Sequence, residues 1–195
     1  MYKIIAIIGE SGAGKDSIAE QVLIELAARK HLDDVHEIVH CTSRPIREYE
    51  TDGVNYYFYH PKIFEQKIMD DEMLEFTRFN NWWYGTGYDS MRSDGVVNIG
   101  VFNPAGVRQL LERAECEVYV YRICVSDKTR LVRQLDREVH PDVREIVRRF
   151  NADYEDFQNL EFDYIELVNE DMRDFYDSVE EIVCQVETLL AQGQK

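Results

Sequence analysis

Cysteine, basic residues and long apolar runs are all scarce in this sequence of 195 residues, and each shortage excludes a class of protein. The four cysteines form no Cys-x-x-Cys pair, which argues against a disulfide scaffold and favours free thiols in a reducing, cytoplasmic compartment. No run approaches the roughly 20 apolar residues that span a bilayer. The 22 Lys and Arg residues against 38 Asp and Glu give a net charge of −16, whereas a non-specific nucleic-acid binder needs a basic surface. We therefore expect neither a membrane nor a nucleic acid as a partner.

The sequence does contain enough apolar material for a folded domain. Apolar residues account for 45% and aromatic residues for 12%, which argues against a disordered chain. The N-terminus is apolar for only a few residues before glycine and charge follow, so we do not expect a secretion signal. The length fits a single domain over 1–195, with or without inserted lobes.

Short apolar runs alternate with stretches of helical periodicity along the chain. Strands are predicted at 3–8, 35–41, 55–59, 74–79, 96–102, 117–125 and 162–168. Helices are predicted at about 15–30, 61–69, 104–114, 128–138, 142–157 and 175–190, and segment 82–87 is predicted to carry a turn. Strands that alternate with helices are typical of an α/β protein with a parallel central sheet flanked by helices. The strand-rich segment 42–86 interrupts this alternation and is predicted to be an inserted lobe.

Residues 9–15 fit the pattern Gly-x-x-x-x-Gly-Lys, between a predicted buried strand and a predicted helix. The glycines allow a tight turn in which successive backbone N–H groups point at phosphate oxygens. The positive end of the following helix and the Lys15 ammonium add favourable charge. An ordinary glycine-rich turn is the alternative, but it explains neither the lysine nor the context. We predict an ATP phosphate site formed by Gly9, Glu10, Ser11, Gly12, Ala13, Gly14, Lys15, Asp16 and Ser17.

The position after the lysine departs from the usual pattern. A Ser or Thr normally stands there and binds Mg²⁺ through its hydroxyl, but this chain has Asp16 followed by Ser17. Asp16 can hold the metal directly or through water, because carboxylate oxygen is a hard ligand. Alternatively Asp16 caps the helix and Ser17 takes the metal role. Both alternatives stay open at this point.

A second set of residues suits a phosphate monoester with a purine base. Arg44 and Arg47 lie three apart in an irregular segment, with Tyr56 and Tyr84 available, and arginine forks with phenol hydroxyls bind phosphate well. Glu75 is the single acid in an apolar strand. It can accept two hydrogen bonds from a guanine edge, or it can be an outward-facing strand residue.

With these residues in this order, the sequence resembles the guanylate kinase family. The resemblance rests on Arg44, Arg47, Glu50, Asp52, Gly53, Tyr56 and Phe58, then Glu75-Phe76, then Tyr84-Gly85-Thr86, all downstream of the phosphate loop. It implies a P-loop NTPase fold with a core at 1–40, 91–126 and 151–195, a monophosphate-binding lobe at 41–90 and a helical lid at 127–150. It also implies ATP and GMP or dGMP as substrates, Mg²⁺ as cofactor, and direct in-line phosphoryl transfer.

The resemblance further assigns roles to individual residues. It implies a GMP site formed by His40, Thr42, Arg44, Arg47, Tyr56, Glu75, Tyr84, Thr86 and Asn103, and it places Asn169 near the donor adenine. Phosphoryl transfer needs positive charge around the equatorial oxygens and little covalent help from the protein. Lys15 and three lid arginines, Arg133, Arg137 and Arg149, are expected to supply that charge on lid closure.

Three departures from the family pattern affect the base-reading positions. An Asp-x-Asp pair is replaced by Val101 and Asn103, so Asn103 is either a base ligand or a simple helix cap. His40 stands where the family has a hydroxyl directed at guanine O6, and it is either a ligand or structural. Trp82 and Trp83 replace smaller residues and can reshape the pocket wall.

Two other functions remain open on the sequence alone. A related P-loop kinase can act on another nucleoside monophosphate or on a ribose phosphate, and Glu75 discriminates that case. A non-catalytic module of the same fold can bind phosphopeptides through the same arginines and tyrosines, but such modules usually have a degraded phosphate loop. The sequence leaves open whether the protein is a monomer or a homodimer.

Overall fold

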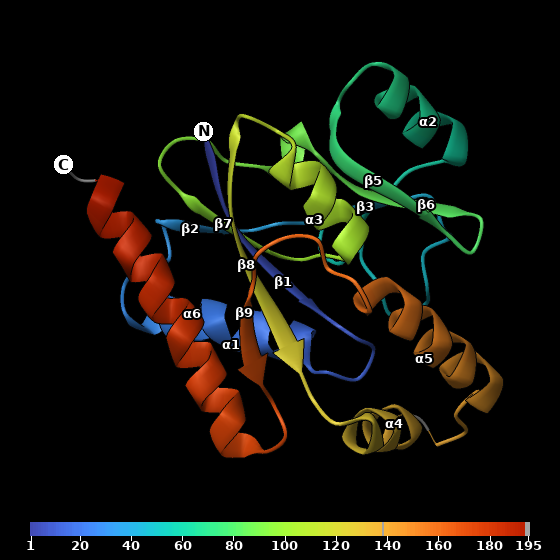
Figure 1. The fold of residues 1–195 in the computed structure, drawn as a ribbon. Helices are drawn as coiled ribbons and strands as arrows, with labels where there is room; N and C mark the ends of the chain where they lie inside the picture. The colour runs from blue at the N-terminus through green and yellow to red at the C-terminus, as the bar shows by residue number, and fades with distance from the viewer. Residues whose placement is uncertain (138, 194–195) are drawn as a thin grey trace.

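The computed structural model describes residues 1–137 and 139–193, and its centre is a parallel five-stranded sheet (Figure 1). The strand order is β2-β7-β1-β8-β9. The strands are β1 (Tyr2–Gly9), β2 (Val35–Glu37), β7 (Val97–Val101), β8 (Cys116–Cys124) and β9 (Ile165–Val168), and every pair is parallel. This sheet and its flanking helices confirm the predicted α/β class.

The central strand β1 is buried on both faces because its apolar run serves two hydrophobic cores. Ile5 and Ile7 pack with α1 (Lys15–Ala28) and α6 (Met172–Gly193) on one face of the sheet. Ile4 and Ile8 face the other side, where they pack with α3 (Pro104–Leu111). Alternate side chains of a strand point to opposite faces, so a continuous apolar run is what this position requires.

A second, four-stranded sheet stands beside the core with the order β4-β3-β6-β5. Its strands are β3 (Cys41–Thr42), β4 (Tyr57–Phe58), β5 (Met73–Phe79) and β6 (Trp82–Gly87), and α2 (Pro61–Met69) covers it. Phe64 of α2 is fully buried against Cys41 and Met73 in a small core of its own. The inserted strand-rich segment therefore folds as a separate mixed layer. A short 3₁₀ helix, η1 (Tyr88–Ser90), leads back to the central sheet.

Two sequence predictions about this layer are wrong. The single strand at 35–41 is two strands, because the chain leaves the central sheet after Glu37 and enters the second sheet at Cys41. The segment 82–87 is strand β6 rather than a turn. The turn lies just before it at Asn80 and Asn81, whose φ angles of 48° and 65° are typical of a two-residue hairpin loop.

Two charged helices follow β8 and reach across the carboxyl end of the central sheet. Helix α4 (Asp127–Asp136) is capped by Ser126, and α5 (Val143–Phe157) is capped by Asp142, as each cap side chain accepts backbone N–H groups of the first turn. Helix α5 is continuous past residue 150, and its last residue, Phe157, is buried in the core. The expected boundary between lid and core thus falls inside one helix.

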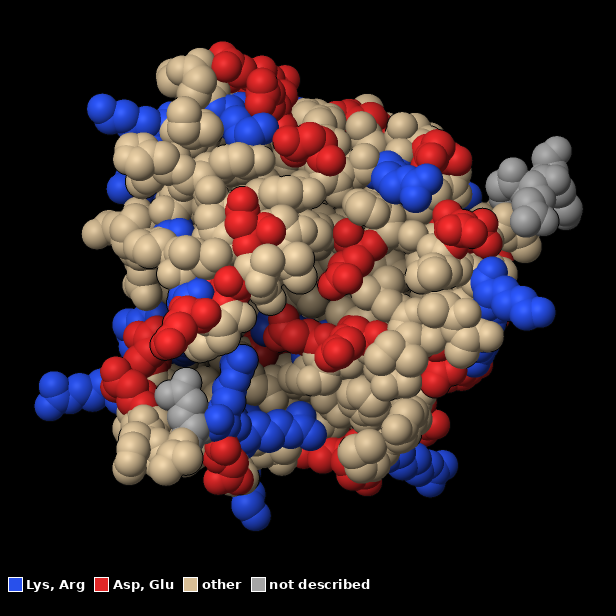
Figure 2. Space-filling model, turned by 180° about the vertical axis from the view of Figure 1, so that it is seen from behind, with Lys and Arg blue, Asp and Glu red and all other residues tan. Residues whose placement is uncertain are grey.

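The outer surface carries charges of both signs. Figure 2 shows acidic and basic side chains interspersed over one face of the molecule. Within 1–137 and 139–193, no helix has both the length and the apolar composition to cross a membrane.

Candidate functional site

The phosphate loop joins β1 to α1 and has the conformation that the motif predicts. Gly12 and Gly14 have φ angles of 85° and 88°, in the left-handed region that favours glycine. A Cβ at Gly14 would stand 2.5 Å from the Asn169 amide nitrogen, so a larger residue would require Asn169 or the loop to shift. Lys15 begins α1 directly after this turn, which directs the positive end of the helix at the loop.

Asn169 and Arg133 hold the loop from its outer side. Asn169 is buried, and its Nδ2 donates to the Ala13 carbonyl at 2.7 Å. Arg133 Nη2 donates to the Asn169 carbonyl at 2.8 Å, and its Nη1 lies 3.4 Å from the Ala13 carbonyl oxygen. Both side chains therefore contact the backbone of the loop.

A cavity of about 190 Å³ opens on the inner side of the loop. Its lining residues come from the loop and from α4 and α5, and they include Ser11, Gly12, Lys15, Asp16, Gln134, Arg137, Glu145 and Arg149. The structure thus brings three of the four predicted charge-supplying residues together, whereas Arg133 lies outside the cavity lining. A triphosphate would find three cations here.

Glu145, which the sequence reading missed, also lies in this cavity. Its carboxylate binds Arg148 at 2.7 Å and Arg149 at 2.8 Å, and the hydrogen bonds lower the pKa of Glu145 to about 2. Glu145 is therefore ionised at neutral pH and acts as the counter-ion of Arg149. The i, i+4 spacing of Glu145 and Arg149 was the available signal.

The two metal candidates differ in placement. Asp16 lines the cavity, its side chain is 82% exposed, and its Oδ2 lies 3.6 Å from Lys15 Nζ. Ser17 is exposed and is absent from the lining among the described residues. Residues 1–137 and 139–193 contain no cluster of three His, Cys, Asp or Glu side chains that could hold a metal ion unaided. Asp16 therefore fits Mg²⁺ that takes its other ligands from phosphate and water.

A larger cleft of about 430 Å³ lies between the second sheet and the central sheet. Five of the predicted acceptor-site residues line it: His40, Tyr56, Glu75, Tyr84 and Asn103. Asp153 and Asp156 of α5 line the same cleft and were not anticipated from the sequence. Asp153 also bonds to Ser11 of the donor cavity, so the two cavities adjoin.

Glu75 lies at the inner end of this cleft in a buried hydrogen-bond network. It is 4% exposed, and Thr86 Oγ1 donates to its Oε1 at 2.7 Å. Burial raises the pKa of Glu75 to about 7, against the lowering effect of the Thr86 hydrogen bond. Thr86 itself is fully buried, is not in the lining of the cleft, and hydrogen-bonds to Glu75 and His40, which are.

His40 completes the network, with its Nδ1 2.8 Å from Thr86 Oγ1. Burial lowers the pKa of His40 to about 4, so the ring is neutral at pH 7. When Glu75 is ionised, the one Thr86 proton goes to Glu75, and His40 Nδ1–H must donate to Thr86. The buried Nε2, which has no partner among the described residues, is then an acceptor. A hydrogen bond donated by Nε2 requires Glu75 to be protonated.

Asn103 is a helix cap that also lines the cleft, and its role as a base ligand stays a prediction. Its Oδ1 accepts the Gly106 N–H at 2.8 Å and caps α3, and its Nδ2 donates to Thr77 Oγ1 at 3.0 Å. The same side chain lines the cleft.

The remaining acceptor residues are outside the cleft lining. Arg44 is 9% exposed and forms two hydrogen bonds of 2.6 Å with Glu50, which lower the pKa of Glu50 to about 2. Its guanidinium stacks 5.1 Å from the centre of the Tyr56 ring. Arg47 is exposed, and Thr42 is fully buried with its hydroxyl donating to the Trp83 carbonyl. Arg44, Arg47, Thr42 and Thr86 are thus not in the lining of either described cavity.

The fold and the phosphate loop together define a P-loop protein. The sequence model of the guanylate kinase family matches residues 1–186, and the chain belongs to this family. A guanylate kinase of Thermotoga maritima is 34% identical over 187 residues, which cover 93% of this chain and 86% of that protein. A guanylate kinase of Bdellovibrio bacteriovorus is 29% identical over 195 residues, which cover 97% and 98% of the two chains.

The overall fold is likewise similar to a solved structure. The crystal structure of guanylate kinase from Anaplasma phagocytophilum matches with a TM-score of 0.61 at 20% identity. The match covers 100% of this chain and 87% of that one. At this identity the likeness concerns the fold.

Proposed function

We propose that this protein transfers the terminal phosphoryl group of ATP to GMP or dGMP. The observation that carries the proposal is the placement of Glu75. It is a buried carboxylate at the inner end of a cleft that adjoins the phosphate loop. An ionised Glu75 accepts two hydrogen bonds, which matches the N1–H and the 2-amino group of guanine.

On this proposal, the donor triphosphate lies in the 190 Å³ cavity against the backbone of the loop. Lys15, Arg137 and Arg149 neutralise charge that gathers on the transferred phosphoryl group. Bound Mg²⁺, held on the protein side by Asp16, would neutralise further phosphate charge. The Arg149–Glu145 ion pair must break when the donor triphosphate binds, because Arg149 then pairs with the phosphate oxygens.

The acceptor is proposed to occupy the 430 Å³ cleft, with its phosphate towards Tyr56 and Tyr84 and its base towards Glu75. Arg44 is held behind Tyr56 by Glu50, and its guanidinium supports the Tyr56 ring at the phosphate end. The acceptor phosphate is itself an anionic nucleophile at neutral pH. Its oxygen attacks the γ-phosphorus directly, and no protein nucleophile or base is needed.

A coupled ADP-release assay across nucleoside monophosphates and a ribose phosphate tests the proposal. We expect turnover with GMP and dGMP and at least about 100-fold lower kcat/KM with the other acceptors, because a site built to hydrogen-bond one edge rejects others strongly. Turnover with another acceptor but not with GMP would reject the assignment in favour of a related kinase. Failure to bind ATP at all would favour a phosphopeptide-binding module.

A further inference from the structure

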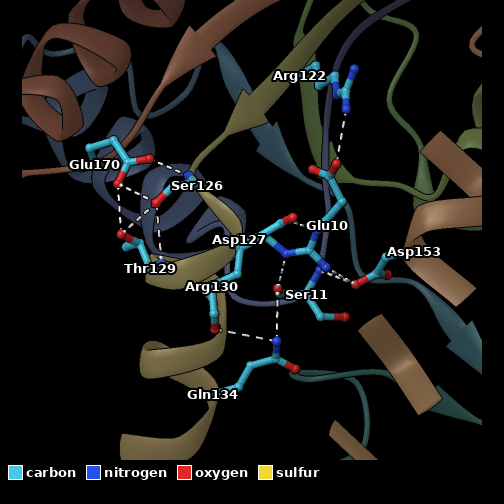
Figure 3. Close-up of polar contacts among 10 residues, drawn as sticks. All are labelled: Glu10, Ser11, Arg122, Ser126, Asp127, Thr129, Arg130, Gln134, Asp153 and Glu170. Atoms are coloured by element: carbon cyan, nitrogen blue, oxygen red, sulfur yellow. Dashed lines mark hydrogen bonds and ion pairs between the residues drawn. The ribbon is translucent and has the colours of Figure 1, made fainter. Parts of the chain in front are cut away.

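An ion pair between buried Arg130 and partly buried Asp153 ties the phosphate loop to both charged helices (Figure 3). Arg130 of α4 is 4% exposed, and its Nη2 donates to Asp153 Oδ2 of α5 at 3.1 Å. The same carboxylate oxygen accepts the Ser11 backbone N–H at 2.8 Å. Arg130 Nε donates to the Ser11 carbonyl at 3.3 Å. The pair thus binds both polar backbone groups of one residue in the phosphate loop.

Neighbouring side chains reinforce this arrangement. Gln134, one turn further along α4, donates to the same Ser11 carbonyl at 3.2 Å. The Arg130 guanidinium stacks on the Phe150 ring with its carbon 4.3 Å from the ring centre. A buried charge is costly unless it is paired and hydrogen-bonded, and removing Asp153 leaves Arg130 with Asp127, at 3.5 Å, as its one described carboxylate partner. In the intact pair, each side chain is bonded both to the other and to the Ser11 backbone.

The start of α4 is fixed to the core by a second set of contacts, also drawn in Figure 3. Glu170 accepts hydrogen bonds from the Ser126 backbone N–H and from Thr129 Oγ1, the latter at 2.8 Å. Glu170 directly follows Asn169, which binds the Ala13 carbonyl. The first turn of α4 is therefore held to the same part of the core as the phosphate loop. These contacts fix the position of the helix that carries Arg130.

The pair also determines where α5 presents its arginine. Arg149 lies four residues before Asp153, and such residues share one face of a helix. Asp153 contacts Ser11, and Arg149 lines the donor cavity beside Ser11 and Lys15. Attaching Asp153 to the loop thus fixes the rotation of α5 that places Arg149 towards the donor phosphates.

We propose that Arg130 and Asp153 are a positioning pair for phosphoryl transfer: together they fix the Ser11 peptide of the phosphate loop and direct Arg149 at the donor. This inference rests on the proposed function for its catalytic part, but its binding part concerns ATP alone. Arg130 is in the lining of neither cavity, and Asp153, whose side chain also lines the acceptor cleft, acts on the donor site through Ser11.

Variants that break the pair are the first test. Arg130→Met and Asp153→Ala are expected to weaken ATP–Mg²⁺ binding in calorimetry and to lower kcat by about 100-fold, since a misplacement of about 1 Å can cost that much. For Arg130→Met, KM for the acceptor should stay within about twofold, because Arg130 is not in the lining of the acceptor cleft, whereas Asp153 is. The double variant should be no worse than the poorer single variant, since both remove one unit. Asp153→Asn keeps an acceptor for the Ser11 N–H and should restore part of the activity.

Matched controls separate positioning from general charge loss. Arg144→Met and Glu155→Ala remove exposed charges from the same helix α5 and should leave the ATP dissociation constant and kcat unchanged. Pair variants that fold, as judged by Tm, and keep both the ATP dissociation constant and kcat within about twofold of the parent would overturn the inference.

The parent protein provides a test that does not depend on the folding of any variant. Without nucleotide, the Ser11 amide should exchange its hydrogen slowly because Asp153 accepts it. Exchange at the rate of an open loop amide would overturn the inference. If the parent binds ATP but does not phosphorylate GMP, the proposed function fails, whereas the ATP affinities and the Ser11 exchange still decide the role of the pair.

Discussion

At the scale of single residues, Glu75 shows how one buried group can link binding and pH. Its buried carboxylate lies in the cleft wall with Thr86 as its one described hydrogen-bond donor. Burial disfavours the charged form, whereas guanine recognition requires it. Keeping Glu75 ionised therefore costs free energy in the empty protein, and the same charge provides selectivity for guanine in the complex.

Glu75→Gln should reduce kcat/KM for GMP by about 100-fold or more, because the amide cannot accept both base hydrogen bonds. The ATP dissociation constant should stay within about twofold, since the donor cavity is unaltered. Steady-state kinetics and calorimetry check the two halves. Glu65→Gln, an exposed change in the same lobe, serves as the control. Equal loss with every acceptor would show that Glu75 does not read the base.

The raised pKa of Glu75 also predicts a pH dependence of stability. The folded-state pKa is about 7 and the ordinary value is 4.5, so the folded protein binds more protons between these values. The contribution of Glu75 to the free energy of unfolding is fully present below about pH 4.5 and is lost as pH rises through about 7. Denaturant unfolding of the parent and of Glu75→Gln from pH 5 to 8 measures this difference. Parallel curves for the two proteins would contradict it.

At the scale of elements, the strand–loop–helix unit at 2–28 contains most of the donor site. Its left-handed glycines, buried strand and helix start are local features, so the motif predicts their conformation. Helices α4 and α5 add the remaining charges through contacts that no local pattern reveals.

Gly14→Ala should weaken ATP binding, because its Cβ would clash with Asn169 Nδ2 at 2.5 Å and Asn169 or the loop would have to shift. We expect the ATP dissociation constant to rise at least about 10-fold and stability to fall by about 1–3 kcal/mol. Gly95→Ala is a matched control, because its φ of 92° is similar but a Cβ there meets nothing within 4 Å. That variant should lose about 1 kcal/mol of stability and keep its ATP affinity. If the two variants bind ATP equally well, the close approach of Asn169 is unimportant.

At the scale of the whole molecule, the sequence predicts the central sheet, the phosphate loop and several cleft residues. It does not predict how these elements pack against one another. The apolar period identifies β1 and α1, and ordered polar residues identify the acceptor lobe. The pattern could not show that the run at 35–41 divides between two sheets, because buried apolar residues (Val35, Ile38 and Cys41) continue through both parts. It also could not pair Arg130 with Asp153, because their contact depends on how α4 and α5 cross the loop. Side-chain positions that depend on such crossings need a structure.

The central claim is that the two adjoining cavities bind the donor and the acceptor of one phosphoryl transfer. Transfer of an isotopic label tests this claim most directly. ATP labelled at the γ-phosphorus is incubated with the protein, Mg²⁺ and GMP, and the nucleotides are separated. The account predicts label on the β-phosphate of GDP, with little in inorganic phosphate. Label that appears only in inorganic phosphate, on the protein or on a different acceptor would contradict it.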